Sequence, residues 1–496
     1  MRARGDALAA VASALALASC AVGPNYVEPE PPIPDAWHLK LTRGLAEGQA
    51  SLQTWWTTLA DQQLNDLIER AYVGNLDLAI AIDRMDEARA RRGIARGDWF
   101  PDADAGASFQ RVRTSGDFPP LPLNGNQTTS IWSAGLDASW ELDFFGRIRR
   151  SVEAADAGLM ASVENYRDVL VVLYADVATS YVSVRTLQER IRYARSNVEL
   201  QRQTMQLTVD RNKAGLAPVL DVRQAELNLA TTEAFIPTLE AARVRTINRL
   251  GVLLGMTPGV LHQELAWEAP IPLPPPAIPV ALPFELLRQR PDIRRAEREL
   301  ASQSAQIGVA TADLYPRFAL LGTFAFDATD LTSLFTGDTR SFGFGPAFRW
   351  NLFDGGRVRS NIQAEEALAR QAESVYQNTV LAAYEEVESS MVDYEQEYER
   401  RDALERSVVA ARASVELVTT LYRTGLTDFQ NVLDTQRALF TQQDALANSN
   451  GTVTLNLIRI YKALGGGWTP PADDGDPATQ EEEAMDGERA VPEEDA

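Results

Sequence analysis

Four segments of the chain alternate between apolar and polar residues, the pattern of β-strands with one apolar and one polar face. The clearest begins at Trp132, where every second residue up to Leu142 is apolar and the residues between are polar or Gly. Another runs from Phe342 to Leu352 and has Phe or Trp at most of its apolar positions. A weaker segment precedes each of these two, so the pattern predicts two strand hairpins. They span residues 102–143 and 317–353.

Two long stretches carry apolar residues at steps of three and four, which predicts helices packed along other helices. Residues 147–214 and 357–424 contain no Pro. At 1.5 Å per residue each could form a rod of roughly 100 Å. Each ends at a Gly-Leu pair, where the Gly suits a left-handed helix cap, and return helices are expected over residues 219–254 and 429–464. The residues at the two turns are Gly215, Leu216, Gly425 and Leu426.

The chain contains this pattern twice. Residues Trp140 to Gly255 align without a gap with Trp350 to Gly465, at a constant separation of 210 positions. A fixed separation over such a length indicates that the spacing itself is constrained, as in a repeat of one architectural unit. We therefore predict an α+β fold with an internal two-fold repeat. The copies span residues 61–268 and 284–467, and the Pro-rich segment 269–283 joins them.

Large aromatic residues cluster where the predicted strands meet the helices, as interfacial aromatic residues do in membrane barrels. A soluble sandwich alternates in the same way, so alternation alone does not decide whether the strands face lipid. If they do, four strands are too few, because bacterial barrels begin at eight and an open edge in lipid is prohibitive. The barrel would then be shared between protomers, and a dimer and a trimer both meet the count. The aromatic positions are Trp99, Phe100, Trp140, Tyr315 and Trp350.

The amino terminus has the features of an export signal. Residues 1–19 carry two Arg and then an apolar run that is too short for a permanent membrane helix. The run ends in Leu-Ala-Ser before Cys20, which resembles the bacterial lipobox, and Cys20 is the only Cys of the chain. We predict a lipoprotein signal peptide at 1–19, acylation of Cys20 and a lipid-anchored segment at 20–60. The alternative is that Cys20 is an ordinary buried Cys. The residue after Cys20 is Ala21 and not Asp, which implies, by resemblance to such lipoproteins, sorting to the outer membrane.

Charge and residue inventory exclude several functional classes. The formal net charge is −22, which argues against nucleic acid as a partner. The stretch 473–495 holds eleven acidic residues and one Arg, so residues 468–496 are expected to form a disordered acidic tail. The chain has two His, no second thiol, no phosphate-binding Gly loop and no metal-ligand motif. We therefore expect no catalysis, no metal site and no cofactor.

Five short motifs are spread from the amino-terminal to the carboxy-terminal part of the chain. They are Val22–Tyr26, Trp55–Trp56, Asn75–Asp77, Leu433–Arg437 (LDTQR) and Tyr461–Trp468 (YKALGGGW). In combination they resemble the outer membrane factors of tripartite efflux systems, which are TolC-type channels. The lipoprotein branch with NodT and OprM-like members is the most similar, and the resemblance covers Cys20 to Trp468.

The resemblance implies a homotrimer in which four strands from each chain form one twelve-stranded barrel, continued by a helical barrel through the periplasm. It implies a passive exit duct in the outer membrane for drugs or metals. A periplasmic adaptor and an inner-membrane pump, expected to be of the resistance-nodulation-division type, would deliver the substrates. Outer membrane lipids would surround the strands.

The resemblance also implies roles for the residues at the two helical turns. In this family the turns meet the adaptor, so Gly215, Leu216, Gly425 and Leu426 are expected to dock it.

A periplasmic gate is implied at the second turn. TolC-like channels close there through acidic rings and a Tyr just before the turn, which Asp434 and Tyr422 match here. The chain departs from TolC at Asn431, where TolC has a second Asp, and at Thr427, where TolC has an Arg. Tyr422, Asn431 and Asp434 are therefore the expected gate residues, with fewer charges than in TolC.

Two other readings remain open at this point. Within the channel class, an ATP-driven exporter could deliver a protein, as in type I secretion. In a different class, a coiled-coil surface lipoprotein acting as a spacer would explain Cys20 and the long helices but would leave the hairpins without a role. The sequence does not name the substrates, the pump, the adaptor, the resting state of the gate or the role of the acidic tail.

Overall fold

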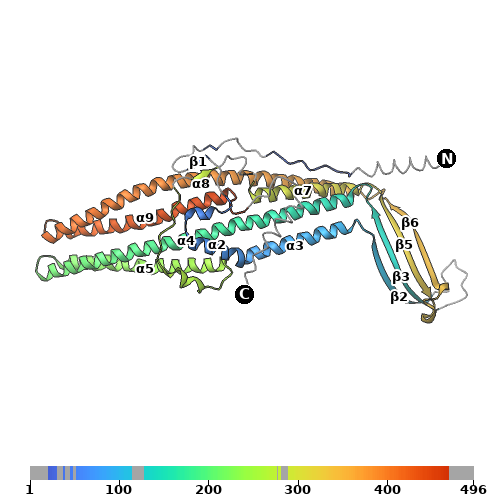
Figure 1. Cartoon of the computed structure of the whole chain (residues 1–496), viewed down its shortest axis with the longest axis horizontal. Coiled ribbons are helices and arrows are strands. Elements are labelled where there is room, and N and C mark those ends of the chain that lie inside the picture. Colours follow the sequence, from blue (N-terminus) through green and yellow to red (C-terminus); the bar gives the residue numbers. More distant parts are fainter. Residues whose placement is uncertain are drawn as a thin grey trace. The chain divides into compact units, whose positions relative to one another are not determined.

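The computed structural model describes residues 21–30, 37–38, 45–47, 52–113, 128–275, 278–280, 287 and 289–468. Its helices and strands follow one another from β1 to α9 (Figure 1). The predicted signal peptide at 1–19, the predicted acylation site Cys20 and the acidic tail beyond residue 468 lie outside the described residues.

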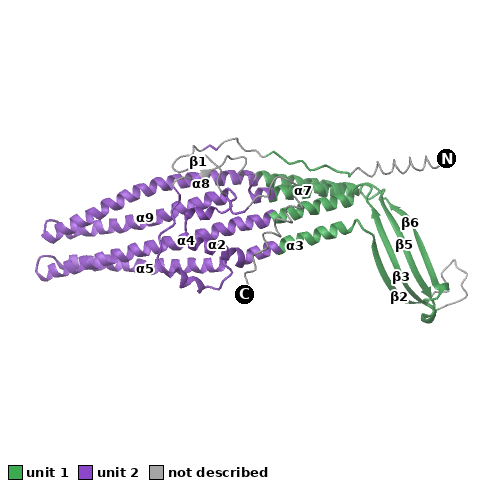
Figure 2. Ribbon diagram, viewed as in Figure 1, with its two compact units in different colours: residues 1–30, 83–163, 295–377 green, residues 31–82, 164–294, 378–496 purple. Residues whose placement is uncertain are grey.

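The chain forms two compact units, and each is built from parts of both repeats (Figure 2). Unit 1 comprises residues 1–30, 83–163 and 295–377, and it includes all strands of the larger sheet. Unit 2 comprises residues 31–82, 164–294 and 378–496, and it includes both helical turns. The division therefore cuts across the long helices instead of separating the repeats, since equivalent parts of the two copies pack together.

Unit 1 contains an antiparallel sheet of four strands in the order β2-β3-β5-β6. The two hairpins meet between β3 and β5, where Trp132 lies opposite Ala328 and Leu142 lies opposite Phe318. The outer strands β2 and β6 are the two free edges. The strands are β2 (Asp102–Arg113), β3 (Thr128–Leu142), β5 (Arg317–Ala328) and β6 (Arg340–Arg349), with the short helices η4 (Leu331–Ser333) and η5 (Gly337–Thr339) before β6.

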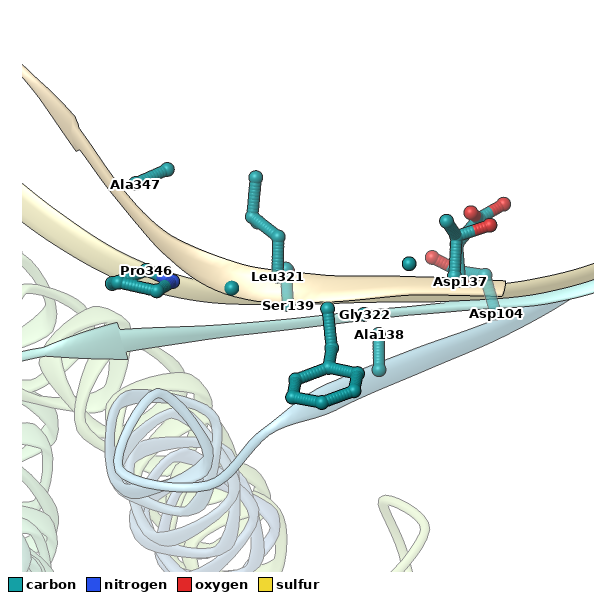
Figure 3. A pocket seen from close by; sticks show the side chains of 12 residues that line it. Asp104, Asp137, Ala138, Ser139, Leu321, Gly322, Pro346 and Ala347 are labelled. Atoms are coloured by element: carbon teal, nitrogen blue, oxygen red, sulfur yellow. The ribbon is translucent and has the colours of Figure 1, made fainter. Parts of the chain in front are cut away.

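The register gives this sheet one apolar and one polar face, as the alternation predicts. On the apolar face of β6, Phe342, Phe344 and Phe348 are 70%, 85% and 70% exposed. On the polar face, Asp104 of β2 lies opposite Asp137 of β3, and both carboxylates project from the same side of the sheet (Figure 3). So large an exposed apolar surface is typical of a region that contacts lipid or another chain.

Four helices extend from the sheet and the turns: α4 (Arg147–Lys213), α5 (Val219–Leu253), α8 (Arg357–Thr424) and α9 (Phe429–Ala463). Pro237 lies inside α5. One apolar stretch of α4 meets the length and composition of a membrane-crossing helix, but 67% of it is buried inside the protein. Val177, Ala178 and Val182 of α4, for example, are fully buried, so this stretch reads as the core face of a packed helix.

In unit 2 the interface between α4 and α9 carries buried polar pairs. Asn197 donates to Gln443 at 2.6 Å, and Gln436 donates to Thr204 at 2.7 Å. The two pairs are seven residues apart on each helix and run in opposite directions, so they mark an antiparallel heptad register. Because a shift of either helix would leave buried amides unpaired, these bonds specify how the two repeats align.

Aromatic residues form the core around the shorter elements of unit 2. Trp55 is fully buried and stacks on Tyr461 with 5.2 Å between ring centroids, and Trp56 packs against Tyr174 at 4.8 Å. Trp468 lies under the guanidinium of Arg167 at 4.7 Å. The Trp-Trp and carboxy-terminal motifs thus pack together. The shorter elements are η1 (Trp55–Leu59), α2 (Gln62–Gly74), η2 (Val260–His262) and η3 (Glu264–Ala266), whereas α3 (Leu76–Gly97) and α7 (Pro291–Ala312) extend into unit 1.

A second, small sheet also lies in unit 2. Strand β1 (Leu45–Glu47) pairs in parallel with β4 (Ile278–Val280), and Leu45 lies opposite Ile278. The sequence predicts only an anchored segment at 20–60 and a linker at 269–283, without this pairing. Three-residue strands are too short to show periodicity.

The amino-terminal segment packs closely within unit 1. The Val22 amide donates to the Phe145 carbonyl at 3.1 Å. Arg150, which is 3% exposed, donates to the Val22 carbonyl at 3.2 Å and to Asn25 at 2.7 Å. Gly23 has φ +90°, and a Cβ there would lie 2.5 Å from the Gly308 Cα, so this approach requires Gly.

Candidate functional site

The two helical turns of unit 2 share one backbone geometry. Gly215 after α4 has φ +73°, and Gly425 after α8 has φ +78°. The amides of Leu216 and Leu426 each donate to the carbonyl five residues earlier, at 2.8 and 2.9 Å. This is the Schellman arrangement, in which a left-handed residue ends the helix. The Gly-Leu pairs thus form the left-handed caps that the sequence predicts.

Apolar side chains are exposed at both turns. Leu216 and Leu426 are 67% and 74% exposed, and after the first turn Val219 and Leu220 are exposed as well. The first turn therefore presents a broader apolar surface than the second. Exposed apolar residues grouped at a helical turn are typical of a contact surface for another protein.

Tyr422, one of the predicted gate residues, lies in a buried cluster beside the turns. Its side chain is 3% exposed and packs with Ala225 of α5 and with Phe429, Val432 and Leu433 of α9. The rings of Tyr422 and Phe429 are 5.3 Å apart. Tyr422 therefore joins the end of α8 to the starts of both return helices, and burial raises its pKa above the ordinary value.

Arg211, near the end of α4, covers this cluster. Its guanidinium lies 4.8 Å from the centre of the Tyr422 ring, and its Nη1 donates to the Arg423 carbonyl at 2.9 Å. One side chain of the first repeat thus holds both the ring and the backbone at the end of α8. Arg211 is not among the residues predicted to form the site, although its repeat partner, Leu421, is apolar. That change from apolar to charged was the available signal.

Two carboxylates interact at the starts of the two return helices. Asp221 is in the first turn of α5, and Asp428 is the N-cap residue of α9. Burial raises the pKa of Asp221, the Asp428 carboxylate raises it further, and Arg211 lowers it. The Asp428 carboxylate therefore disfavours the ionised form of Asp221, whereas Arg211 favours it.

The other two predicted gate residues do not join Tyr422. Asn431 and Asp434 lie on the exposed side of α9, away from its buried positions Val432 and Leu433. Asn431 donates to the Thr427 hydroxyl at 2.9 Å, and Asp434 accepts from Gln430 at 3.0 Å. Within one chain these two side chains thus face outward, while Tyr422 is a core residue.

The five predicted belt residues lie together in unit 1, where strands and helices join. The indole of Trp140 donates to the Trp99 carbonyl at 2.9 Å, and that of Trp350 donates to the Leu314 carbonyl at 3.1 Å. Before the strands the repeats are 215 positions apart, so Leu314 is the repeat partner of Trp99 and the two bonds are equivalent. Tyr315 stacks on Phe145 at 4.6 Å. All five side chains are partly exposed, from 38% for Trp140 to 71% for Phe100.

Titratable residues do not gather into a metal-binding cluster within the part of the chain that the structure describes. His262 lies with its Nε2 2.9 Å from the Asn248 side-chain oxygen.

Comparison with known proteins identifies the architecture. The family model described as outer membrane efflux protein matches residues 67–256 and 282–466, one segment in each repeat. Nodulation protein T of Rhizobium leguminosarum bv. trifolii is 32% identical over 463 residues, covering 93% of this chain and 97% of the relative. Cation efflux system protein CusC of Escherichia coli O6:H1 is 30% identical over 457 residues, covering 92% and 97%. The solved outer-membrane channel OprN matches with a TM-score of 0.85 at 36% identity, covering 91% of this chain and 100% of that one.

The comparisons confirm the resemblance and with it the α+β fold with four strands in each chain. Channels of this family lie in the outer membrane and extend into the periplasm. They are homotrimers that work with periplasmic adaptors and inner-membrane pumps of the resistance-nodulation-division type. Both repeats match the family model, and the matches extend over more than nine tenths of each relative. The chain belongs to the outer membrane efflux protein family.

Proposed function

We propose that this protein is the passive exit duct of its efflux system. Substrates delivered by a pump and an adaptor would enter at the helical turns and leave through the barrel without chemical change. The observation that carries this proposal is the pair of capped turns, with exposed Leu216 and Leu426 on the outside and buried Tyr422 behind them. One end of the chain thus combines a contact surface with a core that can hold the turns together.

The cargo is proposed to be set by the pump. One relative, CusC, is named for cation efflux, and another, SrpC of Pseudomonas putida at 30% identity, is named for solvent efflux. Such different cargo among similar chains supports a duct that does not itself select. Type I protein secretion is the second candidate, and the neighbouring genes discriminate. A resistance-nodulation-division pump gene supports efflux, whereas an ATP-driven exporter gene supports secretion.

The docking surface is proposed to be Leu216 and Leu426 on the caps formed by Gly215 and Gly425. Leu216→Glu and Leu426→Glu keep each Gly, so the caps should fold. Buried charge at a contact surface is unfavourable, so both variants should lower efflux while trimers persist. Leu368→Glu is a matched control, because Leu368 is also an exposed leucine, 44% exposed, but lies in α8 within unit 1. Wild-type efflux from both turn variants would contradict docking there.

The gate is proposed to combine Tyr422 in the core with Asn431 and Asp434 on the exposed face of α9. Three copies of Asp434 around the trimer axis would form one anionic ring. The Arg that TolC has is replaced by Thr427, and Arg211 supplies a cation to the same cluster from the other repeat. We infer that packing around Tyr422 contributes more to the closed state than charge does.

The membrane attachment is proposed to involve acylated Cys20 together with the barrel. The segment that follows Cys20 is held by Arg150 close to Phe145, next to Tyr315 of the aromatic belt. Two anchors of different kinds would keep the chain in the outer membrane. A coiled-coil spacer lipoprotein would need only the acyl chains, so the unacylated protein would then dissolve in plain buffer. We expect the unacylated protein to require detergent.

The proposed function as a whole is tested in planar bilayers and in cells. Purified trimers should conduct ions without any nucleotide or chemical substrate. Cells that lack the chain should accumulate a fluorescent substrate of the partner pump, and the restored gene should lower the accumulation. Accumulation that is unchanged by the gene would refute the proposal.

A further inference from the structure

The two free edges of the four-stranded sheet carry opposite charges near the aromatic belt. Edge strand β6 ends in Arg349, and edge strand β2 begins with Asp102 and has Asp104 two residues later. All three side chains are exposed, and none has a hydrogen bond or ion pair to the described part of the chain. Unpaired charges of opposite sign on two open edges are complementary surfaces for two copies of one chain.

Inside one chain two of these three charges lie opposite like charges. Arg349 lies directly opposite Arg317 on β5, and Asp104 lies directly opposite Asp137 on β3. Arg317 has its own partner, because it donates to Asp313 at 2.5 Å. Like charges in directly opposite positions destabilise a strand pair. The isolated sheet therefore carries repulsion that a neighbouring edge of opposite charge would relieve.

The strand lengths restrict how two copies pair. In the trimeric barrel, β6 of one protomer must run antiparallel beside β2 of the next, since these are the only edges of the sheet. Strand β6 has ten residues and β2 has twelve. All ten residues of β6 find partners within β2 only when Arg349 lies opposite position 102, 103 or 104.

The two faces of the sheet remove one of these choices. One row of directly opposite partners crosses the sheet through residues 102, 139, 321 and 345, so Asp102 and Gly345 lie on the same face. Arg349 lies on that face as well, because it is four residues after Gly345 and side chains alternate between the faces. A register with Ala103 opposite Arg349 would turn the exposed Phe side chains of β6 to the polar face. The two remaining registers place Arg349 opposite Asp102 or opposite Asp104. A row of paired residues that starts at position 102 of one protomer then continues at position 106 or 108 of the next, a displacement of four or six residues. These displacements correspond to strand tilts of roughly 35° and 45°, within the usual range for barrels.

We propose that Arg349 of each protomer forms an ion pair with Asp102 or Asp104 of the neighbouring protomer, and that three such pairs set the register of the barrel seams. In either register Arg349 lies opposite one Asp and diagonal to the other, so both carboxylates are within reach. The inference rests on the trimeric barrel of the family and is independent of the proposed gate and docking surface.

The apolar face supports the same seam. With Arg349 opposite Asp102, Phe348 and Phe344, which are 70% and 85% exposed in the single chain, lie opposite Ala103 and Ala107. With Arg349 opposite Asp104, Phe348 lies opposite Ala105, and Phe344 lies opposite Phe109, an aromatic pair of the kind that stabilises paired strands. Large rings beside small residues fill the outer surface of a sheet without steric conflict.

At the other end of the seam, where β6 begins, the facing charges have the same sign. Arg340 comes opposite Arg111 or Arg113 in the two registers, so like charges meet there. The attraction at Arg349 must outweigh this repulsion, which makes Arg340 a useful control.

Charge reversal in the full-length protein tests the ion pair. Arg349→Glu puts a carboxylate beside two others at each of three seams, so the trimer should be lost in SDS at a temperature where the wild-type trimer is intact. A second change, Asp102→Arg or Asp104→Arg, should restore the trimer. The better rescue identifies the register. Arg340→Glu, on the same strand, should leave the trimer at least as resistant as wild type.

A trimer as resistant in Arg349→Glu as in wild type would overturn the proposal, as would failure of both second changes to restore it. Cross-linking provides a readout that does not depend on charge. Directly opposite residues of antiparallel strands have Cα atoms about 4.5–5.5 Å apart, within the range of a disulfide.

We expect Arg349→Cys combined with Asp102→Cys or Asp104→Cys to give disulfide-linked dimers and trimers that a reductant dissociates, under the oxidising conditions of the cell envelope. Arg349→Cys with Ala103→Cys, whose side chains would lie on opposite faces, is the matched control. Intact trimers without a cross-link in either Asp pair would overturn the register, and this result is separate from any loss of efflux.

Discussion

Replacing Tyr422 by Ala tests whether the buried cluster at the helical turns holds the channel closed. The side chain is 3% exposed. A buried aromatic side chain removes about 150–250 Å² from water, which at about 25 cal/mol per Å² corresponds to ~4–6 kcal/mol. Measured losses for aromatic-to-Ala changes in cores are about 3–5 kcal/mol. The cation–π contact with Arg211 adds about 1 kcal/mol at a partly exposed site.

A loss of about 4 kcal/mol would raise the population of separated turns by roughly a thousandfold, because about 1.4 kcal/mol is a factor of ten. We therefore expect Tyr422→Ala trimers to show larger or more frequent conductance steps in planar bilayers. Hydrogen exchange in residues 205–225 and 418–435 should become faster. Tyr422→Phe keeps the ring and should stay close to wild type, with a change of about 1 kcal/mol or less.

Tyr394→Ala is the matched control. Tyr394 is also in α8 and 1% exposed, but it lies 28 residues before Tyr422 and outside the cluster at the turns. It should lower the free energy of unfolding by a similar amount without raising conductance. If hydrogen exchange shows the turns loosened in Tyr422→Ala and the conductance is nevertheless that of wild type, the constriction lies elsewhere.

Three further predictions concern single carboxylates and the anchor. Asp434→Ala should raise conductance and weaken block by divalent cations, because it removes the carboxylates that attract them; if neither changes, Glu416 is the next residue to test in the same bilayers. Cys20→Ser should abolish metabolic labelling with palmitate while trimers still insert, and continued labelling of that variant would disprove acylation at Cys20. The pKa of Asp221 is raised by burial and by Asp428, so ionisation of Asp221 destabilises the folded state. As pH falls through the raised pKa, protonation should therefore slow hydrogen exchange at the start of α5, after correction for intrinsic rates, and Asp221→Asn should be slow already at pH 7.

The alternating segments and the long helices were predictable because each rests on a local rule. Every strand of the larger sheet has one apolar and one polar face, which gives a period of two that a single sequence reveals. The turns were predictable because a helix without Pro that ends in Gly-Leu has few alternatives. The tripartite setting came from the resemblance alone and could not be obtained from periodicity.

Contacts between the repeats were not predictable in the same way. Arg211 and Tyr422 are more than 200 positions apart, and no local pattern links them. The pairing of β1 with β4 joins two segments of three residues each. The separation of Asn431 and Asp434 from Tyr422 was easier to predict. Asn431 and Asp434 are three residues apart, so they share one face of the helix, and apolar Val432 and Leu433 lie on another. Tyr422 is predicted beside them because the family resemblance assigns all three residues to the gate.

The close packing of the amino-terminal segment has a consequence for the order of folding. Gly23 packs on Gly308, which is synthesised 285 positions later. This site does not exist until most of the second repeat has been made and has folded onto the first. The segment thus reaches its packing site only after most of the chain has been made. A contact of such long range is slow to form, so the acylation proposed at Cys20 would have time to take place before the neighbouring segment packs.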